Sequence, residues 1–347
     1  MKALLVVTGR GLGGDAAIAL NLIKSLEKFD VECEIALDAS AHGTLFEENG
    51  YRWHKISIPQ AGGHVATKLS AFKAALKLLS ATFKARKLIK KVDADFVIGI
   101  LGGGAIVGSL GSKFARKPCV SLISTPLDSK VCPRFNKSFI LPEIEMFKED
   151  VLPNNIEKSF YPLADNVGGG DAETAFEKLS GEPKFDKNKK TIVFSSGSSI
   201  FKGTLDAANA VAKSGKYNVV LVGLPLREEY SELISPDIIY LGFVDWINHL
   251  FTFSDLAVLT DDGVMLEEAL ACEIPIVALI KVKWGRYHNM AGVFKGAIIE
   301  SDVEDIDENI NLAFKNYDSL KKNALKYGWE CMDSSDNLAR KILKEVK

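Results

Sequence analysis

The sequence predicts an α/β protein made of two doubly wound, Rossmann-like domains that face a cleft. Its 347 residues exceed the length at which a single hydrophobic core usually stops growing. Short apolar runs without polar alternation, which are typical of strands buried on both faces of a parallel sheet, alternate with helical stretches along the chain. This alternation occurs twice, and the first strand of each half leads into a loop rich in glycine or serine.

Nine runs are predicted strands. In the N-terminal domain, residues 1–165, they are 3–7, 31–37, 96–101 and 119–123. In the C-terminal domain, residues 191–332, they are 191–194, 219–222, 238–241, 256–259 and 276–280. Residues 166–190 concentrate glycine, proline and charge, as a linker does. Residues 333–347 have helical apolar spacing, so we expect a helix that packs on one of the domains, for instance back on the first.

The composition is that of a soluble globular protein, with 47% hydrophobic and 25% charged residues. A net charge of -2 offers no general attraction for nucleic acid, which we therefore do not expect as a partner. The five cysteines are widely spaced and form no CxxC pair, which argues against both a disulfide framework and a zinc site. Without a signal-peptide pattern or a spanning run, we expect a cytoplasmic protein, and contact with the inner face of the cell membrane stays open.

Glycines after the first predicted strand spell GxGxxG at Gly9, Gly11 and Gly14, ahead of a predicted helix. Backbone amides at such a helix N-terminus could receive a phosphate. Asp38, just past the second strand, stands where a dinucleotide enzyme would hold a ribose, so an NAD(P)-dependent oxidoreductase is one alternative. The other is that these glycines only allow a tight turn.

Two further loops follow strands in the same way. One comprises Ser195, Ser196, Gly197, Ser198 and Ser199, whose hydroxyls and amides would suit a diphosphate. The other, which includes Gly103 and Gly104, follows the strand at 96–101. Because open α/β sheets bind ligands at the carboxyl ends of their strands, we expect all these loops to point toward the cleft between the domains.

An acidic segment follows the strand at 256–259. Asp261 and Asp262 form a turn that favours a helix cap over half of a metal site. Glu267 and Glu268 come next on the predicted helix, and because helical neighbours point about 100° apart, at most one of them faces a ligand. That carboxylate could accept both hydroxyls of a ribose, or both glutamates could simply lie in water near the positive helix end.

From residue 242 to 299 the chain resembles the C-terminal half of the MurG-like family, glycosyltransferase family 28. These are inverting N-acetylglucosaminyltransferases that act on a lipid intermediate of cell-wall synthesis. The matching pieces are 242–245, 254–256, Glu268 with Pro275, and 287–291. In the first half, residues 11–15 and 102–109 are similar to the family's two glycine loops. The resemblance implies the GT-B architecture.

The resemblance also implies a role for particular residues. The backbone at Val244 would read a uracil, Glu268 would hold the ribose, and the loop 195–199 would take the diphosphate of a UDP-sugar. Arg286, His288 and Asn289 would lie near the donor sugar, and the acceptor-side loops would contain Gly11, Gly13, Gly14, Gly103 and Gly104. Neither a cofactor nor a metal is implied. Val244 could instead be core, and His288 an ordinary surface histidine.

The sequence departs from the family at three places, so the resemblance does not determine the identity of the acceptor. Asp15 stands where the family's first loop ends in histidine, 195–198 reads serine-serine-glycine-serine in place of glycine-glycine-serine-glutamine, and 124–127 replaces a His-Glu-Gln-Asn segment. Inverting transfer needs a base for the acceptor hydroxyl and a cradle for the departing diphosphate. We take Asp15 as the candidate base, with a helix-capping role as the equal alternative.

A basic amphipathic helix is predicted at 68–91, which contains eight basic residues and no acidic one. Its apolar side is expected to pack on the sheet, with contact to anionic lipid as an added role. The sequence thus predicts transfer of a sugar, with an N-acetylhexosamine as first candidate, from a UDP-sugar to a lipid-linked or cell-envelope glycan precursor. A sugar-nucleotide epimerase, the oxidoreductase and a non-catalytic nucleotide-sugar-binding subunit are the alternatives.

Overall fold

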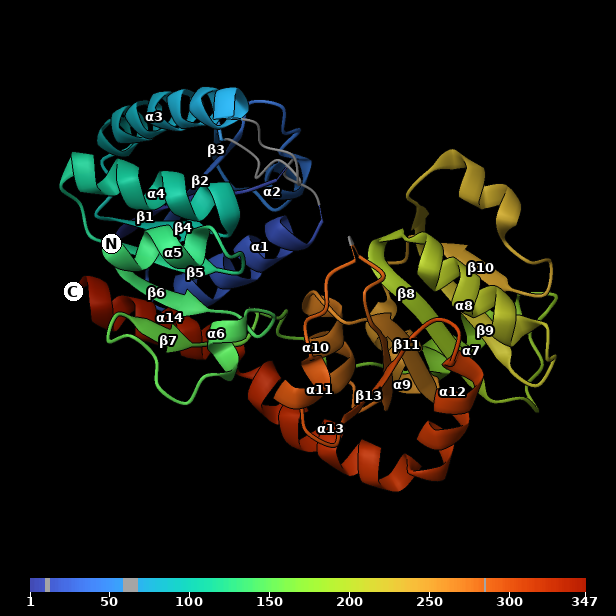
Figure 1. Ribbon diagram of the computed structural model, residues 1–347. Coiled ribbons are helices and arrows are strands. Elements are labelled where there is room, and N and C mark those ends of the chain that lie inside the picture. Colours follow the sequence, from blue (N-terminus) through green and yellow to red (C-terminus); the bar gives the residue numbers. More distant parts are fainter. Residues whose placement is uncertain (10–12, 59–67, 284) are drawn as a thin grey trace. The chain divides into compact units, whose positions relative to one another are not determined.

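The computed structural model describes residues 1–9, 13–58, 68–283 and 285–347 and divides into two compact units (Figure 1). The first unit comprises Met1–Pro162 together with Ser334–Lys347, and the second comprises Leu163–Asp333. Each unit contains one parallel sheet covered by helices, which is the architecture predicted for each half.

The sheet of the first unit has seven strands in the order β3-β2-β1-β4-β5-β6-β7, and all neighbouring pairs are parallel. The strands are β1 (Lys2–Val7), β2 (Glu32–Asp38), β3 (Trp53–Ile56), β4 (Phe96–Ile100), β5 (Cys119–Ile123), β6 (Lys137–Ile140) and β7 (Ile156–Lys158). Because β1 has β2 on one side and β4 on the other, the winding direction reverses between β1 and β4. Ligands of doubly wound sheets bind at such a switch point.

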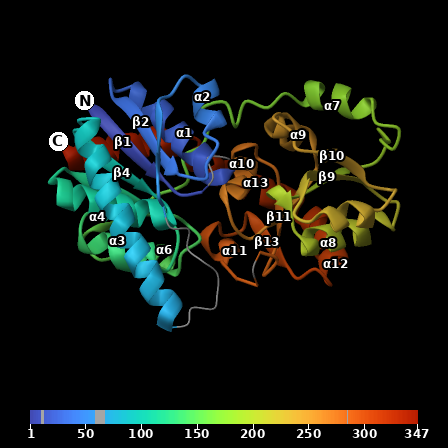
Figure 2. The same cartoon turned by 90° about the horizontal axis from the view of Figure 1, so that it is seen from above.

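The helices of the first unit pack on this sheet, and its core lies between them. They are α1 (Gly14–Glu27), α2 (Thr44–Glu48), α3 (Lys68–Lys91), α4 (Gly102–Ala115), α5 (Asp128–Val131), the 3-10 helix η1 (Cys132–Arg134), α6 (Glu145–Lys148) and α14 (Ser334–Val346). Both ribbon views show α3 running along α4 (Figures 1 and 2). Gly111 permits this approach, because a Cβ there would lie 2.8 Å from the Cβ of Ala85.

The sheet of the second unit has six parallel strands in the order β10-β9-β8-β11-β12-β13. They are β8 (Thr191–Ile200), β9 (Asn218–Pro225), β10 (Ile239–Gly242), β11 (Leu256–Thr260), β12 (Ile276–Leu279) and β13 (Ile298–Ser301). Its switch point lies between β8 and β11. The helices are α7 (Ala172–Ser180), α8 (Lys202–Ala212), the 3-10 helix η2 (Glu228–Leu233), α9 (Ile247–Phe253), α10 (Val264–Ala271), α11 (Met290–Val293), α12 (Ile306–Lys315) and α13 (Tyr317–Met332).

Four short strands were absent from the sequence prediction: β3, β6, β7 and β13. Each has only three or four residues, of which at least two are polar or charged, so no continuous apolar run stands out. Strand β8 also continues to Ile200, beyond the predicted end at residue 194. Residues 166–190, predicted as a linker, belong to the second unit and contain α7, which Asp171 caps by accepting hydrogen bonds from the Glu173 and Thr174 N–H groups.

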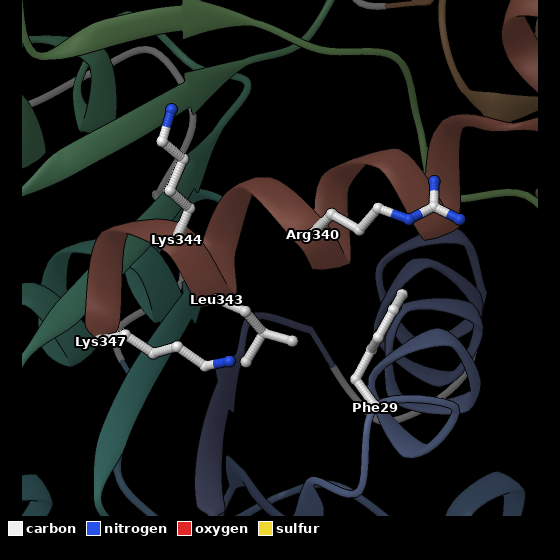
Figure 3. Close-up of a pocket in the computed structure, with 5 residues that line it drawn as sticks. All are labelled: Phe29, Arg340, Leu343, Lys344 and Lys347. Carbon is white, nitrogen blue, oxygen red and sulfur yellow. The ribbon is translucent and has the colours of Figure 1, made fainter.

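The C-terminal helix α14 lies against α1 of the first unit. Lys28 pairs with Asp336 at 3.0 Å, and the Ser334 hydroxyl donates a hydrogen bond to the carbonyl of Tyr161. Figure 3 shows Arg340 directed toward Phe29, with its guanidinium 5.6 Å from the ring centre. These two side chains line a surface pocket together with Leu343, Lys344 and Lys347. In the described part of the chain, no helix is long and apolar enough to cross a bilayer.

Candidate functional site

In the second unit, the predicted serine loop follows β8 at the switch point. Much of the loop is held within the sheet, because Ser195 pairs with Val222 and Ser199 with Leu224 across a register shift. The buried Ser195 hydroxyl donates to the Val222 carbonyl at 3.0 Å. The Ser196 hydroxyl donates to the Ser199 carbonyl at 2.9 Å and accepts the Phe201 N–H at 3.0 Å. Two of the four predicted hydroxyls therefore stabilise the loop itself.

The remaining residues of this loop are more open. Gly197 has a φ of 94°, a conformation that favours glycine, and Ser198 is exposed. Helix α8 begins at Lys202, so Ser199 precedes the helix by three residues. The loop can therefore offer the Ser198 hydroxyl and backbone groups to a ligand.

Glu268 and Glu267 lie on α10, the helix that follows β11 at the same switch point. Glu267 is fully buried, whereas Glu268 is half-buried. Only the second carboxyl can therefore reach a ligand, as expected for neighbours about 100° apart on a helix. Burial raises the pKa of Glu268 to about 7, because a carboxylate loses hydration there.

The loop between β12 and α11 is fastened to the ends of the strands. The fully buried Asp261 accepts the His288 N–H at 3.0 Å, and its other oxygen lies 3.6 Å from His288 Nδ1. Beside this pair, Lys283 and Asp262 form an ion pair at 2.8 Å. The structure therefore brings a half-buried histidine and a lysine together at the end of β11, and sequence reasoning had not singled out Lys283.

The other residues predicted for the donor side lie on the same loop or just after β10. Asn289 has a φ of 49° and caps α11, because its side-chain oxygen accepts the Gly292 N–H at 3.1 Å. Arg286 is exposed on the same loop. Val244 is half-buried just after β10, outside the group of fully buried core residues.

In the first unit, the GxGxxG loop lies after β1, but Gly11 falls outside the described residues. Gly13 is the N-cap of α1 with a φ of 88°, and Gly14 is its first residue. Asp15 is half-buried in the first turn of the helix, so it does not occupy the N-cap position itself. Burial raises the pKa of Asp15 to about 6, which suits a group that takes up a proton near neutral pH.

The second glycine loop starts α4 after β4, on the other side of the switch point. Leu101, the N-cap, has a φ of 55°, and Gly102 has a φ of 44°. A Cβ on Gly104 would lie 2.6 Å from the Thr8 nitrogen and the Val6 carbonyl oxygen, so only glycine lets the helix lie this close to β1. Gly103 is buried beside it.

Two residues that the sequence prediction missed hold this loop. The Gly104 N–H donates to the Thr8 hydroxyl at 2.6 Å, and the Gly102 N–H donates to the Asp128 carboxylate at 2.6 Å. Asp128 is fully buried, which raises its pKa, while its hydrogen bonds from backbone N–H groups oppose part of that rise. The spacing from Thr125 to Asp128 is that of a capping box and could have signalled this role.

Asp38, whose position suggested the NAD(P)-dependent alternative, forms hydrogen bonds within the protein. Its carboxylate accepts the N–H and hydroxyl of Ser40 at 2.9 and 2.6 Å and the Ile58 N–H at 2.8 Å. Burial opposes ionisation there, but these hydrogen bonds outweigh it and hold the pKa of Asp38 below its ordinary value. Among the described residues, no three His, Cys, Asp or Glu side chains are grouped as metal ligands.

Comparison with known proteins gives a family model and distant relatives. Residues 5–122 match the model of the Glycosyltransferase family 28 N-terminal domain. The chain is 23% identical to the UDP-N-acetylglucosamine--N-acetylmuramyl-(pentapeptide) pyrophosphoryl-undecaprenol N-acetylglucosamine transferase of Finegoldia magna, over 99% of both chains. It is 28% identical to the processive diacylglycerol beta-glucosyltransferase of Bacillus subtilis, over 46% of this chain and 44% of that one.

Solved structures are also similar to this chain in their fold. The HepE protein of Anabaena in complex with UDP matches with a TM-score of 0.70 and 17% identity, over 99% of both chains. With two parallel sheets of this topology, the fold is of the GT-B type.

Proposed function

This chain carries the N-terminal domain of glycosyltransferase family 28 on a GT-B fold, and from that premise we propose that it is an inverting glycosyltransferase. Its donor would be a UDP-sugar, with an N-acetylhexosamine as the first candidate sugar, and its acceptor a lipid-linked or cell-envelope glycan precursor. The observation that carries the proposal is the family 28 domain at 5–122, which contains both glycine loops of the first switch point.

The donor nucleotide is assigned to the second unit. Glu268 on α10 would accept the ribose hydroxyls, and the backbone at Val244 after β10 would read the uracil. The diphosphate would bind the open part of the serine loop at Gly197 and Ser198, because the Ser195 and Ser196 hydroxyls are already engaged. Lys283, which pairs with Asp262, would supply positive charge for the departing diphosphate, and His288 would lie beside it near the donor sugar.

Asp15 is assigned as the general base of the first unit. A base must be ionised at the working pH yet basic enough to take the acceptor proton, and the raised pKa of about 6 meets both conditions. The acceptor hydroxyl would lose its proton to Asp15 as its oxygen attacks the anomeric carbon. The bond between that carbon and the UDP oxygen breaks at the same time, which inverts the anomeric configuration.

Membrane contact is assigned to the outer surface of α3 and α4. Phe83 and Phe114 are 52% and 50% exposed and stack at 5.9 Å between ring centres. Leu79 extends this apolar surface, and Arg86 and other basic residues of 77–91 flank it. Aromatic side chains among basic ones suit an anionic lipid surface, where a lipid-linked acceptor would be found. The lipid contact predicted for 68–91 is thus proposed for the described side chains of this helix, from Lys77 onward.

The proposal is tested by binding and turnover measurements with pure protein. We expect UDP, and neither NAD(H) nor NADP(H), to raise the melting temperature, and UDP release from a UDP-sugar to depend on an added acceptor. Stabilisation by a nicotinamide nucleotide alone would contradict the proposal. A changed sugar nucleotide formed without acceptor would identify an epimerase, and UDP binding without any turnover would identify a binding subunit.

A further inference from the structure

The side chain of Asp261 does not serve the helix that follows it. Helix α10 begins after the N-cap residue Gly263, and no side chain caps it, so the helix cap predicted for Asp261 is not formed. The Asp261 N–H donates to the Leu279 carbonyl at 3.1 Å, which continues the pairing of β11 with β12. The backbone of Asp261 is therefore fixed at the end of the sheet, and its carboxylate is available to another segment.

Both oxygens of this fully buried carboxylate face His288. Oδ2 accepts the His288 backbone N–H at 3.0 Å, and Oδ1 lies 3.6 Å from His288 Nδ1. In the part of the chain that the structure describes, Oδ1 accepts no hydrogen bond, and 3.6 Å is longer than such a bond. A buried carboxylate oxygen without a donor is unfavourable, which favours a proton on the ring nitrogen that faces it.

The residues next to His288 are also held in place. The Tyr287 hydroxyl donates to the Glu300 carboxylate on β13 at 2.9 Å, and Asn289 caps α11. The His288 side chain is 15% exposed, while its Nδ1 is buried. The accessible part of the imidazole is therefore the part away from Asp261.

We propose that Asp261 is a positioning residue that fixes the imidazole of His288 in the tautomer with the proton on Nδ1. The neutral ring then has its lone pair on Nε2, which can accept a hydrogen bond but cannot donate one. The consequence for the ligand rests on the proposed transferase function, in which His288 lies near the donor sugar. There Nε2 would accept a hydrogen bond from a sugar hydroxyl, so the donor is a UDP-sugar that presents a hydroxyl to this ring.

The first test determines the tautomer of His288 by ¹⁵N NMR of its ring nitrogens in the full-length protein, at a pH where the ring is neutral. The signals are assigned by their absence in His288→Gln. We expect the proton on Nδ1 in the wild type. In Asp261→Asn, the amide oxygen can still accept the His288 N–H, but the amide NH₂ would donate to Nδ1, so the ring proton should move to Nε2.

Asp262→Asn is the matched control, because the neighbouring carboxylate pairs with Lys283 and its loss should leave the tautomer of His288 unchanged. A proton on Nε2 in the wild type, or on Nδ1 in Asp261→Asn, would overturn the inference. The wild-type measurement decides the point even where Asp261→Asn does not fold. It also needs no ligand, so it is independent of the transferase function.

The second test measures the Kd of UDP and of UDP-N-acetylglucosamine by isothermal titration calorimetry. In Asp261→Asn, an Nε2–H would face the sugar hydroxyl that the lone pair accepted. We expect the affinity for UDP-N-acetylglucosamine to fall by about tenfold or more, as for the loss of a buried hydrogen bond, and the affinity for UDP to stay within about twofold. Glu273→Gln, an exposed change at the end of α10, should alter neither value.

The difference between the two ligands separates positioning from general damage. An equal loss for UDP and UDP-N-acetylglucosamine in Asp261→Asn, or no loss for either, would overturn the role of His288 at the sugar. If the wild type binds neither nucleotide, the proposed transferase function fails instead, and the NMR measurement still decides whether Asp261 fixes the tautomer.

Discussion

At the scale of single residues, burial divides the acidic groups near the strand ends into different roles. Asp128 and Asp261 are fully buried and accept backbone N–H groups, so they hold loops in place. Asp15 and Glu268 are half-buried, and burial raises the pKa of each. The second pair keeps partial access to solvent, which is what a proton acceptor and a ribose ligand require.

Replacing Asp15 by asparagine removes the proposed base but preserves the shape of the side chain. We expect the rate of transfer to fall by about 10²–10⁴-fold, the usual contribution of a general base, with UDP affinity unchanged. In the wild type, kcat/KM should rise with pH through the pKa of about 6, because only the ionised carboxylate accepts a proton. Steady-state kinetics from pH 5 to 8 check both.

Asp93→Asn is the control for that prediction, because its carboxylate belongs to the same unit and is 94% exposed. If Asp15→Asn retained full turnover, or lost UDP affinity in parallel with turnover, Asp15 would not be the base.

Glu268→Gln should change stability in a pH-dependent way. The folded-state pKa of about 7 lies above the ordinary value of 4.5, so the folded state favours the protonated carboxyl. The stability that this provides is present below about pH 4.5 and is lost as the pH rises through 7. At pH 8 the glutamine variant should therefore exceed the wild type by about 1–3 kcal/mol, and near pH 4 the two should agree.

Urea unfolding at the two pH values measures this difference, and Glu273→Gln, an exposed glutamate near the end of the same helix, is the control. A constant difference at both pH values would show that protonation of Glu268 is not responsible. Glu268→Ala should in addition weaken UDP binding, because it removes the proposed acceptor of the ribose hydroxyls.

At the scale of secondary-structure elements, glycines decide how closely α4 approaches its neighbours. Gly104→Ala would place a Cβ 2.6 Å from backbone atoms of Val6 and Thr8, which side-chain motion cannot relieve. We expect a loss of about 2 kcal/mol or more in the free energy of unfolding. Gly14→Ala meets no described atom within 4 Å and should instead stabilise α1 by about 0.4–1 kcal/mol. Chemical denaturation of both variants measures their free energies of unfolding. Equal changes in the two variants would contradict the prediction.

The exposed pair on α3 and α4 gives a second prediction at this scale. Replacing both Phe83 and Phe114 by serine should lower binding to vesicles of phosphatidylglycerol by about tenfold or more, because about 1.5–3 kcal/mol per fully buried ring is lost. The melting temperature should change little, since both rings are about half exposed. Trp329→Ser removes a 65% exposed aromatic ring from the second unit and should leave vesicle binding unchanged. Unchanged binding of the double variant would contradict the lipid contact.

At the scale of the whole molecule, the chain consists of two units with one parallel sheet each. We propose that the donor nucleotide binds the second unit. UDP at about 100 times its Kd should stabilise the unit that binds it by about 2.7 kcal/mol. We therefore expect slower hydrogen exchange in peptides that contain Gly197, Val244 and Glu268. Exchange mass spectrometry with and without UDP measures this, and protection confined to the glycine loop after β1 would contradict the assignment.

The sequence by itself determined the parts of this protein that depend on neighbouring residues. Strands buried on both faces appear as continuous apolar runs, and a tight turn into a helix needs glycine, so two Rossmann-like halves and their loops could be predicted. The same local rule for a helix predicted that at most one of Glu267 and Glu268 would face a ligand. Short strands such as β3 and β7 carry too little pattern to be recognised.

Only the tertiary structure decided which groups meet. The Gly102 amide and the Asp128 carboxylate are 26 positions apart, and no local pattern joins them, although their hydrogen bond holds the second glycine loop. In the same way, only the pairing of β8 with β9 revealed that the Ser195 hydroxyl is used inside the sheet. The physical reason is that hydrogen bonding between strand ends depends on strand order, which the sequence of each strand does not encode on its own.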